Sequence, residues 1–357
     1  MKHLLKANQH QKKRSHKNKY LNPKKLKKVL FIIPPYSNGC TYHRLEIPMH
    51  TMQGIEKHVT TILDGVTDEQ LKSIDMVYFQ GSNGIVDVKK QVKRLKALGM
   101  PYIVDIDDYW ILNKEHLLKK GYSKHTRQKK LLMENATFVT TTTPQLATEI
   151  KKFNKKVEVC VNAIDSTQPQ FEIRKRNSDE FVFGWIGGIH HYIDIKILED
   201  YFTLMNDMPL LIGGVDNHPV WDLITAWSSC NGTKKNYYPI KATNVYSYGF
   251  MYDLLDVALI PLAKNKFNSF KSELKMVEAG MKKKAVIVSD VQPYTNLITG
   301  KNCLSASNGD EFYRKMRFLQ NNKEYANELA ENLYEDVQKK YSLAEANKRR
   351  IQIINSI

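Results

Sequence analysis

The sequence has few cysteines and lacks a long apolar run. Its four cysteines are far apart and do not have the spacing of a metal-binding motif: Cys40, Cys160, Cys230 and Cys303. We therefore expect free thiols in a reducing compartment. No run approaches the roughly 20 apolar residues that cross a bilayer, and lysine and glutamine follow Leu4 and Leu5 where a signal peptide would have its apolar core. These absences predict a cytoplasmic protein with no transmembrane segment.

Acidic residues are also missing from the N-terminus. Residues 1–28 hold eleven Lys or Arg and no Asp or Glu, and the whole chain has a formal charge of +17. Such a polar segment predicts a flexible basic tail over residues 1–27. Basic tails neutralise phosphates, so DNA, a teichoic-acid-like polymer or a lipid phosphate is a candidate partner. A solubilising end without a partner remains the alternative.

Length and periodicity predict two α/β domains. A chain of 357 residues suggests two domains of about 150 residues each. Apolar runs of strand length alternate with helical patterns, which favours parallel sheets covered on both faces. In the first half we expect strands at 28–34, 59–63, 76–80, 101–104, 137–142 and 157–161, and helices at 43–52, 68–73, 86–98, 126–135 and 144–153.

A polar, proline-containing stretch at 166–180 then predicts a linker. The alternation restarts at Phe181, with expected strands at 210–212, 256–262 and 285–290 and expected helices at 193–205, 220–228, 323–339 and 343–354. The predicted units are a first domain at 28–165, a second at 181–340 and a final helical segment at 341–357.

The segment FNSFKSELKMVEAG, residues 267–280, lies between two of these strands and opens a helix. A helix N-terminus offers free N–H groups and a positive dipole end to a phosphate. Glu278, one to two turns inside, is positioned to accept the hydroxyls of a ribose. Lysines in this loop would offset charge on a departing diphosphate. The candidate donor-binding residues here are Lys271, Ser272, Glu273, Lys275 and Glu278, and a solvated charge stripe is the alternative.

A second glycine-bearing strand end, FVFGWIGG at 181–188, precedes two histidines. Gly187 and Gly188 would let the backbone approach a diphosphate. His190 is a candidate for binding the donor and His191 for catalysis, although adjacent histidines are often only exposed. Asp194 is expected to cap the next helix.

Together these motifs resemble GT-B glycosyltransferases, which have two Rossmann-like domains facing across a cleft and C-terminal helices that cross back to the first domain. The likeness covers roughly residues 28–300 and includes the strand at 75–80 and the exit to the linker near Asp165. It implies a nucleotide-diphosphate sugar as donor substrate, no tightly bound cofactor and no essential metal. The chain departs from many relatives at Phe270, where they have a glutamate that contacts the sugar.

The resemblance places the acceptor on the first domain. Gly39 permits close backbone approach and Arg44 can hold an acceptor or phosphate bidentately, unless this is a plain strand-to-helix turn. Asp105, Asp107 and Asp108 follow an apolar strand, and we expect one of them to be the base that deprotonates the acceptor hydroxyl. GT-B enzymes of phages that glucosylate DNA have an aspartate after the equivalent strand in this role. A Mg²⁺ or Mn²⁺ site and a helix cap are the alternatives.

The sequence thus predicts a glycosyltransferase that moves a sugar to an acceptor hydroxyl, with a polyanion such as modified phage DNA as the favoured acceptor. A binding module without catalysis and a nucleotide-sugar epimerase are the alternatives. Retention or inversion at the anomeric carbon is open at this level.

Overall fold

The structure, a computed structural model, describes residues 26–35 and 38–357. The basic tail expected at 1–27 lies outside the described residues except for Leu26 and Lys27, and so do Tyr36 and Ser37 in the loop before Arg44. Within the described part of the chain, no helix is long and apolar enough to cross a bilayer.

The first domain is a parallel six-stranded sheet with the strand order β2-β1-β3-β4-β5-β6. Its strands are β1 (Lys27–Ile32), β2 (Ile55–Thr60), β3 (Met76–Gln80), β4 (Tyr102–Ile106), β5 (Phe138–Thr141) and β6 (Val157–Val159). The central strands β3 and β4 are buried along their whole length, as parallel strands with helices on both faces are.

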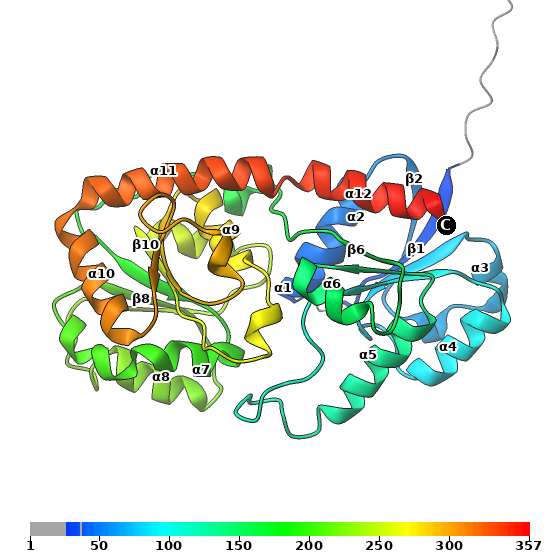
Figure 1. Cartoon of the computed structure of the whole chain (residues 1–357), viewed down its shortest axis with the longest axis horizontal. Coiled ribbons are helices and arrows are strands. Elements are labelled where there is room, and N and C mark those ends of the chain that lie inside the picture. The colour runs from blue at the N-terminus through cyan, green and yellow to red at the C-terminus, as the bar shows by residue number, and fades with distance from the viewer. Residues whose placement is uncertain (1–25, 36–37) are drawn as a thin grey trace, which may run out of the picture.

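The second domain repeats this architecture with the order β12-β11-β10-β7-β8-β9, and all its pairings are parallel. Its strands are β7 (Phe183–Ile186), β8 (Leu210–Val215), β9 (Tyr237–Lys241), β10 (Val257–Ile260), β11 (Ala285–Ser289) and β12 (Leu304–Ala306). The expectation of two Rossmann-like domains is confirmed (Figure 1).

Helices flank both sheets. The first domain has α1 (Gly39–Thr41), α2 (Ile47–Thr51), α3 (Asp68–Lys72), α4 (Val88–Ala97), α5 (Ser123–Asn135) and α6 (Pro144–Ile150). The second part of the chain has α7 (Tyr192–Ile195), α8 (Val220–Ser228), α9 (Leu274–Met281), α10 (Gly309–Asn321), α11 (Lys323–Lys340) and α12 (Leu343–Ser356). A single π-helical turn, Tyr42–Glu46, joins α1 to α2, and such turns are common at functional sites.

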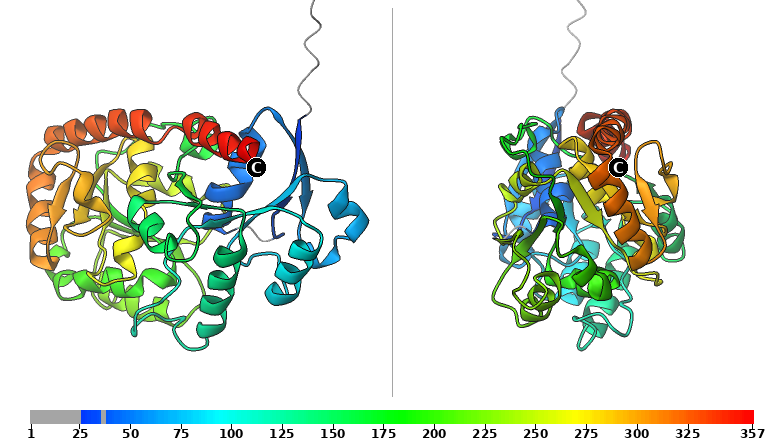
Figure 2. Two further views of the ribbon diagram at one scale, coloured as in Figure 1. Left: turned by 45° about the vertical axis from the view of Figure 1, so that its right-hand side comes forward. Right: turned by 90° about the vertical axis from the view of Figure 1, so that its left-hand side faces the viewer.

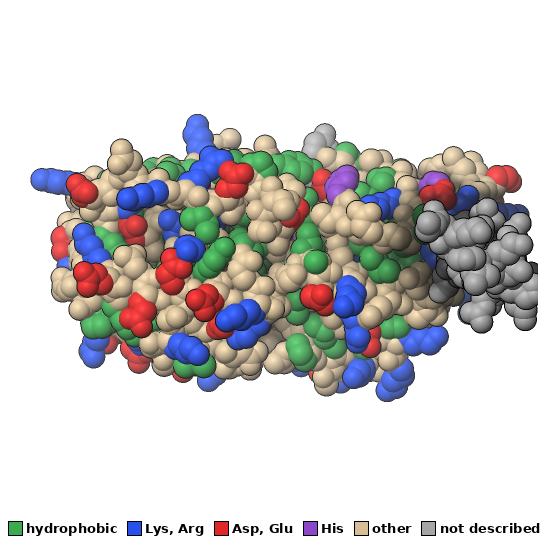
Figure 3. Space-filling model, turned by 90° about the horizontal axis from the view of Figure 1, so that it is seen from above, with side chains coloured by type: hydrophobic (Ala, Val, Ile, Leu, Met, Phe, Trp, Pro, Cys, Tyr) green, Lys and Arg blue, Asp and Glu red, His purple; other side chains and the backbone are tan. Residues whose placement is uncertain are grey.

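The C-terminal helices cross from the second domain to the first, as expected. α11 packs beside α9, whereas Ile353 and Ile354 of α12 join the core of the first domain with Val29 and Phe31. The rotated view in Figure 2 also shows α12 lying beside the first strands. Seen from above, the face over α11 and α12 carries charges of both signs, interspersed (Figure 3).

Two expected elements differ from the observed ones. The strand expected at 59–63 is β2 at Ile55–Thr60, an edge strand that pairs only with β1 and exposes much of its length, so its apolar signal is weak. The single helix expected at 193–205 is α7 followed by short 3₁₀ turns at Lys196–Tyr201 and Thr203–Met205. Its apolar side chains are nevertheless buried at helix-like spacing: Ile195, Leu198, Phe202 and Met205.

Candidate functional site

The donor-side loop after β7 is closely packed around a lysine. Lys275, in the first turn of α9, donates a hydrogen bond from Nζ to the carbonyl of Ile186 and lies 5.6 Å from the centre of the Trp185 ring. A Cβ at Gly187 would come within 2.7 Å of that ring and 2.9 Å of Lys275 Nζ. A Cβ at Gly188 would meet no protein atom within 4 Å. Gly187 is therefore required by the fold, whereas the space at Gly188 is open to a ligand.

His191 and Asp194 form a hydrogen-bonded pair beside this loop. His191 Nδ1 lies 2.7 Å from Asp194 Oδ2, and burial next to Lys275 lowers the pKa of His191 to about 4. The imidazole is therefore neutral near pH 7. Because the carboxylate only accepts, Nδ1 carries the proton and Nε2 has a free lone pair.

Asp194 does not cap a helix, which corrects the expectation. Its Oδ1 accepts hydrogen bonds from Ala263 N at 2.9 Å and from Asn268 Nδ2 at 2.8 Å. Burial opposes its ionisation, but the bonds from His191 and Ala263 hold its pKa below the ordinary value. The ionised carboxylate thus fixes the orientation and the tautomer of His191.

The loop that precedes α9 reaches the first domain. Lys271 and Ser272 lie before the helix starts at Leu274, so they do not form a helical charge stripe with Glu278. Lys271 Nζ lies 3.9 Å from Asp108 Oδ2, and Ser272 Oγ accepts a 2.6 Å hydrogen bond from Asn162 Nδ2. Burial opposes the charge of Lys271, yet Asp108 and Asp194 hold its pKa above the ordinary value.

Glu278 is buried rather than solvated, with 6% of its surface exposed. Its two oxygens accept hydrogen bonds from Tyr248 at 2.6 Å and Tyr252 at 2.8 Å. His43 of the first domain lies 2.5 Å from the Tyr248 hydroxyl, and burial lowers the pKa of this imidazole to about 3. Glu278, which was expected to accept hydrogen bonds from a ribose, is therefore held in a polar network that spans both domains. Its three neighbours in this network, His43, Tyr248 and Tyr252, were not among the predicted site residues.

Arg44 and Asp105 form a buried ion pair, which differs from both expectations. The guanidinium donates bidentately to Asp105, at 2.9 Å from Nε and 2.7 Å from Nη2, and the two residues are 1% and 0% exposed. Thr140 adds a 2.6 Å bond to the same carboxylate. Neither side chain is available to an acceptor in this arrangement. Both residues therefore support the neighbouring site residues from within the core of the first domain.

Arg44 also links this pair to the donor loop. Its Nη1 donates to Asn162 Oδ1 at 3.1 Å, and Asn162 in turn donates to Ser272. One chain of hydrogen bonds therefore runs from the core of the first domain to the loop before α9.

Asp107 and Asp108 lie together where the first domain meets Lys271 of the second. Burial opposes ionisation of Asp107, but Lys129 and contact with the Cys40 thiol hold its pKa below the ordinary value. Burial and the charge of Asp107 raise the pKa of Asp108, against the effect of Lys271. The pair is thus split into a readily ionised carboxylate and one that retains its proton to higher pH.

The Cys40 sulfur and carboxylate oxygens of Asp107 and Asp108 lie within 4.8 Å of one another. Lys129 and Lys271 already balance these two carboxylates. A thiol is also a poor ligand for Mg²⁺ or Mn²⁺. The donor set therefore gives little support to the metal alternative. Gly39, at the start of α1 beside Cys40, has open space where a Cβ would be.

Phe270, the departure from the GT-B pattern, stacks on Tyr109 of the first domain with ring centres 4.5 Å apart. His190 similarly stacks on His116 at 5.9 Å. Both residues therefore contact the other domain through ring stacking.

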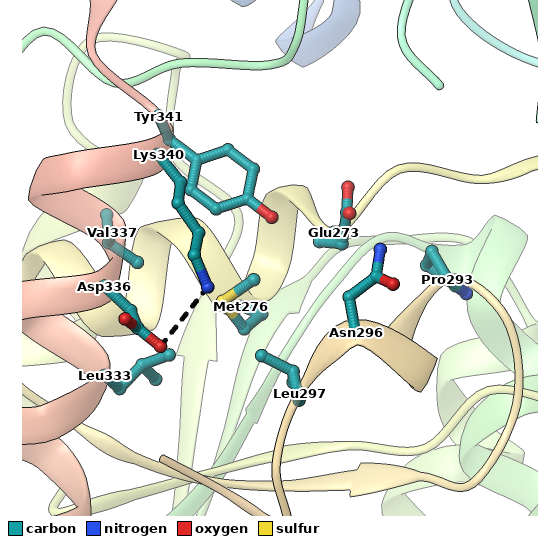
Figure 4. Close-up of a pocket in the computed structure, with 10 residues that line it drawn as sticks. All are labelled: Glu273, Met276, Pro293, Asn296, Leu297, Leu333, Asp336, Val337, Lys340 and Tyr341. Atoms are coloured by element: carbon teal, nitrogen blue, oxygen red, sulfur yellow. Dashed lines mark ion pairs between the residues drawn. The ribbon is translucent and has the colours of Figure 1, made fainter. Parts of the chain in front are cut away.

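Glu273 faces away from these groups. It lines a cavity of ≈ 310 Å³ between the start of α9, the loop after β11 and the end of α11 (Figure 4). Burial raises its pKa, and Tyr341 is its polar neighbour. A larger cavity of ≈ 590 Å³ adjoins it at the junction of α11 and α12. Glu273 is thus separated from the other residues expected to bind the donor.

The structure brings most of the expected residues together between the two domains and adds several others. From the first domain come Asp107 and Asp108, and from the second come Lys271, Lys275 and His191. The added residues are His43, Lys129, Asn162, Tyr248, Tyr252 and Asn268. Of these, Asn162 had a signal in the sequence: it begins the Asn-x-x-Asp stretch at the exit to the linker and follows β6 closely, where parallel sheets place ligands. Lys129, on α5 and far along the chain from β4, had none.

No protein-family model and no curated protein matches the chain. Solved structures match its fold. Anabaena HepE in complex with UDP and glucose superposes with a TM-score of 0.68 at 12% identity, over 93% of this chain and 100% of that one. A glycosyltransferase from Rickettsia africae matches with a TM-score of 0.67 at 11% identity, over 93% and 98%.

Sucrose-phosphate synthase from Thermosynechococcus elongatus matches with a TM-score of 0.68 at 12% identity, over 93% and 98% of the two chains. These similar structures are GT-B glycosyltransferases, and the two six-stranded parallel sheets agree with them. The chain therefore has the GT-B fold.

Proposed function

We propose that this protein is a glycosyltransferase that moves a sugar from a nucleotide-diphosphate sugar to an acceptor hydroxyl. The observation that carries the proposal is the convergence, between the two domains, of Lys271, Lys275 and the His191–Asp194 pair with Asp107 and Asp108. Cations for a leaving diphosphate and a carboxylate for an acceptor proton are the two requirements of this reaction.

The donor would lie on the second domain. Gly188 leaves room for a diphosphate against the backbone, and Lys271 and Lys275 would stabilise the charge that develops on it. Burial lowers the pKa of Lys275 to about 8, so at neutral pH it still carries its proton. A UDP-sugar is the favoured donor class, because HepE of the same fold binds UDP and glucose.

The acceptor would lie on the first domain, near the two aspartates. Asp107, the more readily ionised of them, is the proposed base, and Asp108 would donate or share a hydrogen bond with the same hydroxyl. His191 offers a second acceptor nitrogen, held by Asp194, on the opposite side of the cleft. Arg44 and Asp105 would support this arrangement without touching the substrate.

Donor binding would require the cleft to open. Tyr248 occupies one oxygen of Glu278 and is itself bonded to His43 of the other domain. A ribose that reaches Glu278 would replace part of this network. Closure around the substrates would then exclude water and protect the activated sugar from hydrolysis.

The acceptor is proposed to be anionic. Eleven Lys or Arg in residues 1–28 and a formal charge of +17 favour a partner such as phage DNA, a teichoic-acid-like polymer or a lipid phosphate. Supplying each class to the full chain with one radiolabelled donor would identify which of them receives the sugar.

The first test is a thermal-shift screen against UDP, GDP, ADP and TDP, each with Mg²⁺ or with EDTA. At a hundredfold excess over Kd a true site adds roughly 2.7 kcal/mol of stability. We expect one diphosphate to raise Tm without metal, and Glu278→Ala to abolish the shift, whereas Glu331→Ala on exposed α11 keeps it. No shift with any diphosphate would contradict the proposal.

A turnover assay separates transfer from the alternatives. Incubated with donor alone, a glycosyltransferase releases nucleoside diphosphate slowly by hydrolysis. An epimerase converts the donor to its stereoisomer, and a binding module leaves it unchanged. Either of the last two results would overturn the proposal even if the nucleotide binds.

A further inference from the structure

The loop between β4 and α5 exposes aliphatic side chains among lysines. Ile111, Leu117 and Leu118 are 41%, 37% and 46% exposed and lie within eight residues of one another. Residues 111–127 also contain five Lys or Arg against a single acid, Glu115. Scattered exposed aliphatic residues need no explanation, but three of them in one short loop that is rich in lysine do.

The loop is held in place on its inner side. Lys119 Nζ donates to the carbonyl of Leu112 at 2.8 Å, and Thr126 Oγ1 donates to the carbonyl of Trp110 at 2.6 Å. The His116 ring packs against Phe267 of the second domain with centres 5.4 Å apart. The exposure of Leu117 and Leu118 is therefore part of an ordered conformation.

The basic surface continues beyond the loop. α5 begins with Lys124 and Arg127, and α4 packs beside it with exposed lysines and no acid: Lys89, Lys90, Lys93 and Lys96. Figure 1 shows α4, α5 and this loop along the same lower edge of the molecule. The mixed charges of Figure 3 belong to the opposite edge.

We propose that the loop 111–122, together with the first turn of α5, docks the protein on an anionic lipid surface, with Ile111, Leu117 and Leu118 entering the headgroup region. Lysines bind lipid phosphates while aliphatic side chains gain by leaving water, and together they bind a membrane more firmly than either alone. An anionic polymer would use the lysines but would gain nothing from three exposed aliphatic residues. The observations therefore favour lipid over a polymer.

The loop lies next to the proposed donor site, so docking there would bring the membrane close to the proposed reaction. His116, in its middle, contacts His190 and Phe267 beside the donor loop. A surface bound there would lie beside the residues that join the two domains near Asp108 and Lys271. Membrane docking itself does not depend on the proposed sugar transfer, but its role in bringing an acceptor to the site does. If both hold, the acceptor is a lipid phosphate rather than DNA or another anionic polymer.

The test measures binding of the full chain to vesicles of phosphatidylglycerol and phosphatidylcholine in equal parts, and of phosphatidylcholine alone. We expect binding only to the anionic vesicles. Leu117→Ser with Leu118→Ser should weaken it about tenfold or more, because binding scales with the apolar area buried. Leu223→Ser on α8, where the leucine is 48% exposed, is the matched control and should bind as the wild type does.

Charge is tested in the same way. Lys120→Gln with Lys124→Gln should weaken binding about 25-fold, since each lysine near an anionic surface contributes about fivefold. The control replaces the exposed Lys155 and Lys156 by Gln. Asn154, the preceding residue, donates hydrogen bonds to the carbonyls of Met133 and Ala136, so this pair lies at the end of α5 opposite to the loop. The control pair should change binding less than about threefold.

Absence of binding to anionic vesicles, or wild-type binding by both loop variants, would overturn the inference. Weaker binding in the lysine variant alone, with heparin competing, would assign the surface to an anionic polymer and overturn the lipid assignment. The nucleotide-diphosphate thermal shift of each variant reports separately on the fold and the donor site. Failure of the docking surface and failure of the proposed transfer are therefore distinguishable.

Discussion

At the scale of single residues, the candidate site is built on charged side chains that are fully buried. Arg44 and Asp105 are the clearest case, because each is satisfied only by the other and by polar neighbours. A buried pair adds little net stability, but removal of one partner leaves the other charge uncompensated. Such residues shape the site without contacting substrate.

We predict that Arg44→Ala destabilises the protein by about 3–5 kcal/mol, because it leaves Asp105 buried and unpaired. Equilibrium unfolding in urea measures this. Arg314→Ala is the control, since Arg314 pairs with Asp310 on the exposed side of α10 and such surface pairs contribute at most about 1 kcal/mol. Equal losses in the two variants would argue against the buried pair as a structural requirement.

Asp194 is predicted to act through His191. Asp194→Asn keeps the shape of the side chain but removes the carboxylate that fixes the Nδ1 proton, so kcat should fall about 10²- to 10⁴-fold. The KM for the donor should change little. Steady-state kinetics checks both values, with Asp222→Asn on the exposed face of α8 as control. A rise in KM with unchanged kcat would assign Asp194 to donor binding instead.

At the scale of elements, the strand-end loop after β7 and the start of α9 form one unit. Lys275 bonds the carbonyl of Ile186, and Gly187 fits only because it has no Cβ. The donor loop is therefore specified by two segments about 90 residues apart in the sequence.

Two glycine substitutions distinguish packing from ligand contact. Gly187→Ala would push a Cβ against Trp185 and Lys275, so we expect a loss of stability of about 1–3 kcal/mol together with weaker donor binding. Gly188→Ala meets no protein atom, so its Tm should be unchanged while donor affinity falls. Differential scanning fluorimetry with and without the nucleoside diphosphate tests both. Unchanged donor affinity in Gly188→Ala would place the diphosphate elsewhere.

At the scale of the whole molecule, the helix α12 follows the second domain in the sequence but packs into the core of the first domain. Asn347 of α12 donates to Pro48 O at 3.1 Å and Thr51 Oγ1 at 2.7 Å, and Ile354 is 0% exposed. The two domains are therefore coupled through the crossover as well as across the cleft.

Ile354→Ala is predicted to destabilise the first domain by about 2–5 kcal/mol, the usual cost of deleting a buried isoleucine side chain to alanine. Ile298→Ala, at a residue 55% exposed, is the control and should change stability by less than about 0.5 kcal/mol. Thermal unfolding monitored by circular dichroism compares the two. A neutral Ile354→Ala would mean that the crossover helix contributes nothing to the first domain.

Stability is also predicted to fall between about pH 6.5 and 4. The pKa of His43 is lowered to about 3 and that of His191 to about 4, whereas unfolded histidine titrates near 6.5. Below pH 6.5 the unfolded state therefore binds more protons, and each histidine removes up to about 1.4 kcal/mol of unfolding free energy per pH unit.

Urea titrations at several pH values test this linkage. His43→Gln should remove the contribution of one histidine, so the unfolding free energy should depend less steeply on pH than in the wild type. Parallel curves for the wild type and His43→Gln would contradict a buried neutral His43.

The sequence alone determined the parts of this protein that depend on local pattern. Apolar runs of strand length with helices between them specify two parallel sheets, and β3 and α8 lie where their residues predicted. The edge strands β9 and β12 and the helix α10 escaped prediction because edge strands are short and polar, and an amphipathic helix next to a longer one gives no boundary of its own. The glycines and lysines near α9 were recognisable because their residue types are specific to phosphate chemistry.

Only the tertiary structure decided which of these residues face the cleft. Arg44 and Asp105 carry the residue types of a binding site, yet they are 61 positions apart and neutralise each other in the core. Glu273 and Glu278 lie five positions apart on one short segment, yet they point to a separate cavity and to a network of tyrosines. Burial and ion pairing are long-range properties, so a residue's chemistry is readable from the sequence while its availability is not.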